Sequence, residues 1–140
     1  MKNNRGFSLL ELLIVVAIIL IIATIAIPSL LRSRQSANET AAVANLRTMN
    51  TAEVTYASGT GGTFGRIADL VTAGLLDARF SEGGTISGYT LTSAAAGGTY
   101  TIGSIPSGTS GRYNYVTYED GVTRYGTSPA PGAVAGGPVR

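Results

Sequence analysis

A single carboxylate stands inside a long apolar run near the start of the chain. Residues 7–27, FSLLELLIVVAIILIIATIAI, carry one formal charge, that of Glu11. A helix of this length spans about 30 Å, which matches the hydrocarbon core of a bilayer. An ionised side chain at the centre of such a helix is unfavourable by about 2.5–3.5 kcal/mol, and residues of this kind usually serve a function through a partner. We therefore expect Glu11 to pair with a positively charged group.

The residue types that most often carry catalysis and metal binding are absent. The chain has no His, no Cys and no Trp, which removes the commonest general base, the commonest metal ligand and any disulfide. Glu82, Glu119 and Asp120 are candidate calcium ligands, although no segment has the spacing of a calcium-binding loop. We expect no enzymatic activity, no cofactor and no metal site.

The net charge of +2 is concentrated at the amino end. Without Lys2 and Arg5, the chain carries eight basic and eight acidic residues. A balanced domain of this kind lacks the basic surface through which proteins bind the phosphates of nucleic acids. We therefore predict no specific nucleic-acid partner.

The apolar segment could be processed in three ways. A secretory signal peptide would be removed after the segment, but its apolar stretch is usually about 7–15 residues long, and residues 24–26 form a poor cleavage site. An uncleaved single-span anchor fits the length but gives no reason for Glu11. A cut just before Phe7 would leave the apolar helix on the mature protein.

The first residues favour the cut before Phe7. Lys2 and Arg5 precede Gly6-Phe7, and Glu11 follows four residues after Phe7 in GFSLLELLIVVAII. This pattern resembles the class III signal of type IV pilins and the related pseudopilins, and the strong likeness covers residues 5–57. The resemblance implies that a prepilin peptidase cleaves between Gly6 and Phe7 and N-methylates Phe7. It also implies a homo-oligomeric helical filament, built by an inner-membrane pilus or secretion machinery.

The resemblance further implies assembly roles for Phe7, Glu11 and Pro28. The cut creates an α-amine on Phe7, and such an amine is mostly protonated at neutral pH because its pKa is about 7.7–8.0. We expect Glu11 to pair with this amine, within one helix or between copies, and so to set the offset at which helices stack. Pro28 falls where such pilins bend their helix, and proline kinks a helix because it has no N–H.

The pattern predicts an α+β fold of the type IV pilin kind, in which a long N-terminal helix, kinked at Pro28, packs on a small antiparallel sheet of three or four strands. The stripe that faces the sheet consists of Ala42, Leu46, Met49, Ala52 and Tyr56. The predicted parts are a leader (1–6), a transmembrane and assembly helix (7–28), its continuation (29–58), a globular head (59–127) and a low-complexity tail (128–140). Within the head, we expect a short helix at 66–77 and strands at 88–92, 99–104, 112–118 and 122–125.

The leading hypothesis is a structural subunit of a type IV pilus. Such a subunit would be a single-pass protein of the bacterial inner membrane before assembly and part of an extracellular filament afterwards. A pseudopilin of a type II secretion system is the first alternative, although the head has no clear acidic calcium loop of the sort that major pseudopilins carry. A secreted soluble binding domain, released after Ala26, is the second. A methylated Phe7 at the mature amino end separates the first two hypotheses from the third.

Overall fold

The computed structural model describes residues 7–127, so the predicted leader (1–6) and tail (128–140) lie outside the described residues. The chain divides into two compact units, Met1–Arg34 and Gln35–Arg140. Helix α1, Leu9–Gly59, supplies the helical part of the first unit and one layer of the second. Each unit is described by itself.

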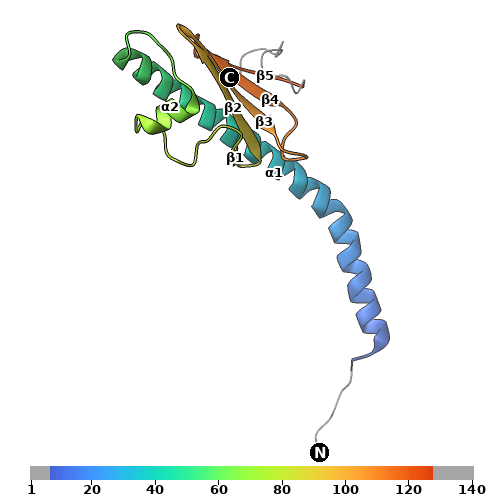
Figure 1. Ribbon diagram of the computed structural model, residues 1–140. Helices are drawn as coiled ribbons and strands as arrows, with labels where there is room; N and C mark the ends of the chain where they lie inside the picture. The colour runs from blue at the N-terminus through green and yellow to red at the C-terminus, as the bar shows by residue number, and fades with distance from the viewer. Residues whose placement is uncertain (1–6, 128–140) are drawn as a thin grey trace, which may run out of the picture. The chain divides into compact units, whose positions relative to one another are not determined.

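In the first unit, α1 begins at Leu9 and continues through Pro28 (Figure 1). Because proline has no N–H, the carbonyl of Thr24 four residues earlier receives no helical hydrogen bond at this point. The helix nevertheless does not end there, in agreement with the predicted continuation beyond residue 28. The kink itself stays a prediction.

The second unit contains an antiparallel sheet of five strands, in the order β1-β2-β3-β4-β5. The sheet therefore has more strands than the predicted three or four. The additional strand, β1, has two residues and is too short to show an alternating pattern. The strands are β1 (Thr85–Ile86), β2 (Tyr89–Ala96), β3 (Thr99–Pro106), β4 (Asn114–Tyr118) and β5 (Thr123–Gly126).

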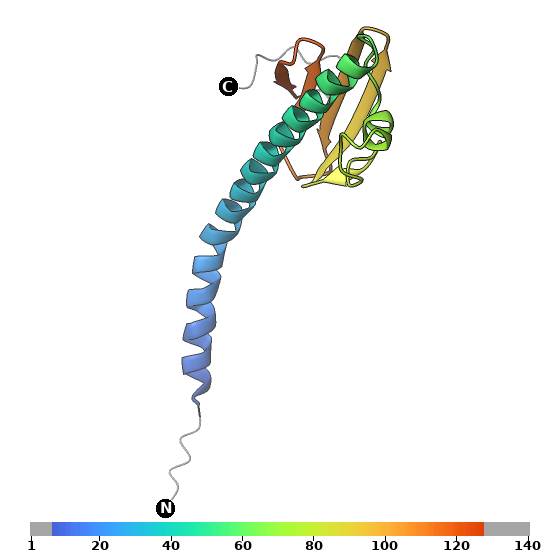
Figure 2. The same ribbon diagram turned by 90° about the vertical axis from the view of Figure 1, so that its left-hand side faces the viewer.

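The later part of α1 lies along one face of this sheet (Figure 2). The predicted stripe on the helix is confirmed, because Ala42, Leu46, Met49 and Ala52 are buried and Tyr56 is partly buried against them. The helix and the sheet share one apolar core, which confirms the predicted α+β arrangement. On the sheet side, this core contains Tyr89, Leu91, Tyr100, Ile102 and Tyr115.

A second, shorter layer covers the same core. Helix α2, Ile67–Thr72, buries Ile67 and Leu70. It ends earlier than the predicted 66–77 because Gly74 takes a φ of 72°, which residues with a Cβ rarely adopt and which turns the chain out of the helix. The N–H groups of Leu75 and Leu76 both donate to the carbonyl of Leu70, which closes this turn.

Two glutamates on the buried face of α1 have opposite environments. Glu53 is 0% exposed, and within the described residues one carboxylate oxygen accepts only the N–H of Gly65, at 3.1 Å, while the other has no partner. Burial raises the pKa of Glu53, and the nearby Asp69 adds to the effect. Glu39 instead accepts three hydrogen bonds from Arg112, and this pairing lowers the pKa of its carboxyl.

These environments predict opposite responses to pH. Because the pKa of Glu53 is raised by folding, its favourable contribution is full below about pH 4, near the unfolded pKa of a glutamate, and is lost as pH rises through the folded pKa. The free energy of unfolding of the Glu53→Gln variant, measured as its difference from that of the unsubstituted chain, should therefore increase between pH 4 and pH 7. The increase should be on the order of 1 kcal/mol. Unfolding of the detergent-solubilised chain, followed by the near-ultraviolet circular dichroism of its tyrosines, measures this difference.

Glu39→Gln is the matched control, because the lowered pKa of Glu39 gives stability that is present at neutral pH and lost as pH falls. For Glu39→Gln, the difference in free energy of unfolding from the unsubstituted chain should decrease between pH 4 and pH 7. Parallel pH profiles of the two variants would contradict the assignment.

Candidate assembly segment

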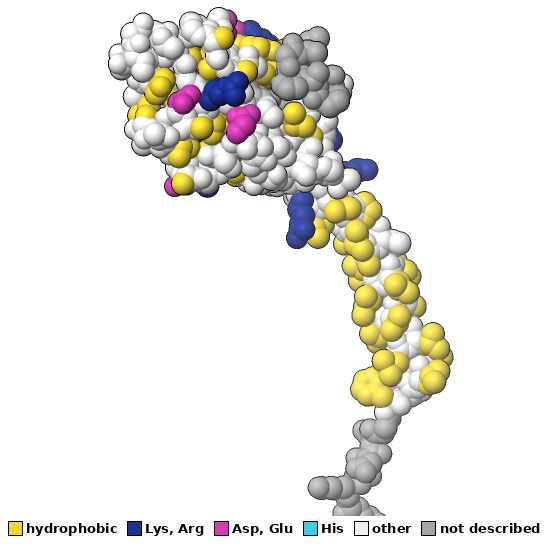
Figure 3. Space-filling view, in the orientation of Figure 1, with side chains coloured by type: hydrophobic (Ala, Val, Ile, Leu, Met, Phe, Trp, Pro, Cys, Tyr) yellow, Lys and Arg dark blue, Asp and Glu magenta, His cyan; other side chains and the backbone are white. Residues whose placement is uncertain are grey.

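The large apolar side chains of residues 7–27 are all exposed. The most apolar stretch of α1 has a mean hydropathy of 3.1 with none of its residues buried, and within the described residues α1 is the helix long and apolar enough to cross a membrane. Among the large apolar side chains of residues 7–27, the exposed fraction runs from 81% for Phe7 to 48% for Val16. Figure 3 shows apolar side chains along this part of the helix. A surface of this size and polarity needs lipid or other apolar helices around it.

Glu11 has a local role at the start of this helix. Its Oε2 accepts a hydrogen bond from the backbone N–H of Ser8 at 2.9 Å, and the carbonyl of Ser8 accepts the N–H of Leu12. Ser8 thus occupies the N-cap position, and Glu11 occupies the third helical position, from which a glutamate reaches back to the cap. The carboxylate also lies at the end where the helix dipole favours negative charge.

The role of Ser8 was not predicted, although the sequence contains a signal for it. Ser8-Leu9-Leu10-Glu11 has the spacing of a capping box, in which a serine is followed three residues later by a glutamate. Glu11 therefore has two possible partners, the amide of Ser8 and the α-amine that the predicted cleavage would create on Phe7.

The second polar side chain of the segment forms its hydrogen bonds within the helix. The hydroxyl of Thr24 contacts the carbonyl oxygens of Leu20 at 2.9 Å and Ile21 at 2.7 Å. A hydroxyl bonded to its own helix can enter an apolar environment at little cost. Thr24 consequently does not need a partner outside the helix, whereas the charge of Glu11 does.

The predicted site residues lie at the two ends of the segment. Phe7 and Glu11 are at its start and Pro28 is inside α1, while Gly6 lies outside the described residues. In the uncleaved chain the nitrogen of Phe7 belongs to a peptide bond, so its pairing with Glu11 stays a prediction. The roles of Gly6 and Pro28 also stay predictions.

The candidate calcium ligands of the head are used elsewhere. Glu82 accepts hydrogen bonds from the backbone and hydroxyl of Ser93, and Asp120 forms an ion pair with Arg124. Among residues 7–127, no three His, Cys, Asp or Glu side chains are grouped so that they could hold a metal ion. Glu82, Glu119 and Asp120 are thus not brought together.

Comparison with known proteins gives a family match at the same end of the chain and similarity to two pilus proteins. The family described as "Prokaryotic N-terminal methylation motif" matches residues 1–27. The type IV wide pilus major component PilA4 of Thermus thermophilus is 54% identical over 46 residues, which are 33% of this chain and 35% of that protein. The type IV major pilin protein PilA of Myxococcus xanthus is 46% identical over 56 residues, which are 40% of this chain and 26% of that protein.

These matches support the predicted class III signal and the similarity to type IV pilins. They cover about a third and a quarter of the length of the two relatives. The family match concerns the amino-terminal segment, which contains the methylation motif and the apolar residues that follow it.

The two possible partners of Glu11 can be separated by substitution. Glu11→Gln keeps an oxygen that can accept the N–H of Ser8 but removes the charge, while Glu11→Leu removes both. If charge pairing dominates, both variants should insert into the membrane and yield several-fold fewer filaments, because an unpaired α-amine in an apolar core is unfavourable. Filament yield by electron microscopy, normalised to subunit abundance, measures the effect.

Thr24→Val is the matched control, since it removes a polar group from the same segment that already bonds to its own helix. It should leave the filament yield unchanged. Native yield with Glu11→Gln and loss with Glu11→Leu would instead assign Glu11 to helix capping.

Proposed function

We propose that this chain, which over 33–40% of its length is similar to two type IV pilus proteins, is a structural subunit of a type IV pilus. The observation that carries the proposal is the apolar segment of α1, which has no buried residues in its most apolar stretch and contains one charged group, Glu11. In lipid, acyl chains cover this surface. In a filament, the same surface is covered by the corresponding helices of other copies.

The processing steps follow from the methylation motif. A prepilin peptidase removes residues 1–6, and the new amine of Phe7 receives a methyl group. The amine lies one helical turn from Glu11, so the two charges can neutralise each other within a chain or between copies. Since lipid tails are as apolar as leucine, the transfer from lipid to filament gains little hydrophobic energy, and packing and charge pairing decide the association.

Assembly moves the subunit from the membrane into the filament. Before assembly, the apolar segment holds the chain in the bacterial inner membrane as a single span, where the assembly machinery collects it. After assembly, the head belongs to an extracellular filament. The proposed function is structural, since both similar proteins are named as major components of pili.

The relatives favour the pilin over the pseudopilin alternative, because both are named as major components of type IV pili. The family match at residues 1–27 disfavours the soluble binding domain, because release after Ala26 would remove almost all of the matched segment. Adhesion, motility and DNA uptake are not selected by any feature of the head.

The mature amino end tests this proposal. Mass spectrometry of the chain from its native cell should find Phe7 as the first residue, carrying one additional methyl group. Gly6→Val should block the cut, since glycine provides the small residue before the cleaved bond, and the leader should then stay attached. Ala26→Val is the control, because it would block only a cut after the apolar segment and should leave the amino end unchanged. A mature chain that starts at Ile27 would sink the proposal.

A further inference from the structure

Two arginines directly follow the apolar part of α1. Arg32 and Arg34 are exposed, as are Leu30 and Leu31 before them. The helix from Leu9 to Leu31 is about 34 Å long, and the hydrocarbon core of a bilayer is about 30 Å thick. With the apolar segment in a bilayer, the two arginines therefore lie where the hydrocarbon ends and the layer of lipid headgroups begins.

Neither arginine has a partner within residues 7–127. No ion pair or hydrogen bond of these two guanidinium groups occurs there, and the next acid along α1, Glu39, is held by Arg112. A guanidinium pairs best with an anion that accepts two of its N–H groups at once, such as a carboxylate or a phosphate. Arg32 and Arg34 therefore need anions from outside this part of the chain.

We propose that Arg32 and Arg34 bind the phosphate groups of anionic phospholipids in the membrane leaflet at this end of the apolar segment. The inference rests on the proposed function in one respect, namely that the segment spans a bilayer before assembly. Each guanidinium would donate N–H groups to phosphate oxygens, while its aliphatic part lies against the edge of the hydrocarbon. These contacts would hold the segment at one depth in the membrane.

The positions of the two arginines favour lipid over a single protein partner. Side chains two residues apart in an α-helix lie about 200° apart around its axis, so Arg32 and Arg34 point to nearly opposite sides. An acidic protein surface that approaches the helix from one side could neutralise only one of them. Lipid headgroups surround a spanning helix, and anionic ones attract basic residues next to it. They can therefore neutralise both arginines at once.

The proposed orientation of the chain gives a second reason. Basic residues beside a membrane span are usually concentrated on the cytoplasmic side, where this orientation places Lys2 and Arg5. Arg32 and Arg34 would lie on the opposite side, against this preference. Anionic headgroups in that leaflet would compensate for their charge.

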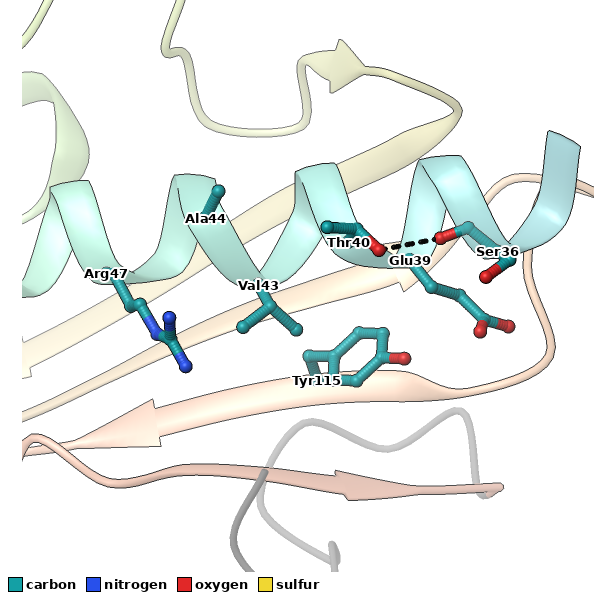
Figure 4. Close-up of a pocket in the computed structure, with 7 residues that line it drawn as sticks. All are labelled: Ser36, Glu39, Thr40, Val43, Ala44, Arg47 and Tyr115. Atoms are coloured by element: carbon teal, nitrogen blue, oxygen red, sulfur yellow. Dashed lines mark hydrogen bonds between the residues drawn. The ribbon is translucent and has the colours of Figure 1, made fainter. Parts of the chain in front are cut away.

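A third exposed arginine of α1 serves as a control. Arg47 belongs to the head, where it lines a groove between α1 and Tyr115 of β4 with a volume of about 320 Å³ (Figure 4). The carboxyl group of Glu39 lines the same groove, and its negative charge disfavours a phosphate there. Substitution of Arg47 therefore removes a positive charge from the same helix without changing the residues beside the apolar segment.

Quenching of a single tryptophan measures which lipids surround the arginines, since the chain has no tryptophan of its own. Leu31→Trp places this reporter next to Arg32, and the full chain is reconstituted into vesicles of phosphatidylcholine and phosphatidylglycerol. Each lipid in turn carries bromine atoms near the top of its acyl chains, and the two quenching curves give the ratio of association constants. The ratio should favour phosphatidylglycerol at least about tenfold, because one arginine near an anionic surface contributes about fivefold.

Substitution of the arginines should remove this preference. In the reporter chain, Arg32→Gln and Arg34→Gln should each lower the ratio several-fold, and the double variant should bring it close to one. Arg32→Lys combined with Arg34→Lys should keep part of the preference, because an ammonium supplies the charge without the fork of N–H groups. Arg47→Gln should leave the ratio unchanged. The circular dichroism of the tyrosines confirms that the head is intact in every variant.

Four results would overturn the inference. The first is a ratio near one in the reporter chain, and the second is an undiminished ratio in the double glutamine variant. The third is loss of the preference when inorganic phosphate replaces chloride at equal ionic strength, which would assign the arginines to a free anion. The fourth is loss of filaments in the double variant while the lipid ratio is unchanged, which would assign them to acidic groups of a second copy.

Failure of this inference can be distinguished from failure of the proposed function. Washing the vesicles with alkaline carbonate releases proteins that only adhere to the membrane. Release of the unsubstituted chain would contradict the proposed function, because the apolar segment would then not span the bilayer. A chain that stays inserted but shows no preference for phosphatidylglycerol would contradict only the contact between the arginines and lipid.

Discussion

Burial of one face of α1 against the sheet is the interaction on which the head depends. Leu46 and Met49 are fully buried on the helix, and Tyr89 and Ile102 are fully buried on the sheet. Without the helix, the apolar face of the sheet would be open to water, and no disulfide could compensate because the chain has no cysteine. The same helix carries the apolar segment. A substitution in α1 can therefore affect both the stability of the head and the association of copies.

Two buried glutamates lie on the same face of α1 as the apolar stripe. Glu39 precedes Ala42, and Glu53 lies between Ala52 and the partly buried Tyr56. Glu39 is held in its charged form by Arg112, which follows β3 along the chain, whereas Glu53 is enclosed by protein with one backbone donor. Each joins α1 to a loop, one before β4 and the other before α2. These polar bonds fix where the helix lies along the sheet, which apolar contacts alone define less well.

Much of this structure could be predicted from the pattern of residue types. The unbroken apolar run and the absence of glycine and proline from Ser29 to Ala57 predict α1, and the spacing of Leu46 and Met49 predicts its buried face. The missed features depend on contacts between distant residues. Alanines 94–96 disfavour a strand by themselves, yet they pair with Thr99, Tyr100 and Thr101 in β3. The burial of Glu53 could not be predicted either, because its neighbours Gly65 and Asp69 could not be known from the spacing.

Part of the candidate site could be predicted from the sequence, and part could not. The positions of Phe7, Glu11 and Pro28 come directly from the sequence, and the family match supports the motif that contains the first two. The groove beside Tyr115 could not be predicted, because it forms only when β4 is placed next to α1 by the intervening strands. A short sequence motif records local chemistry, whereas a groove between elements depends on the complete fold.

The hydrogen bond between Ser8 and Glu11 has a consequence for the free carboxylate oxygen. Within the described residues, Oε2 is occupied by the amide of Ser8 and Oε1 accepts no hydrogen bond. A glutamate on an apolar helix would ordinarily sample several rotamers, and immobilising it upon contact would reduce the affinity. Here the helix start already restrains the side chain, so part of this entropy has been lost before any partner arrives. If the predicted ammonium group of Phe7 is the partner, it would meet a restrained acceptor instead of a mobile one.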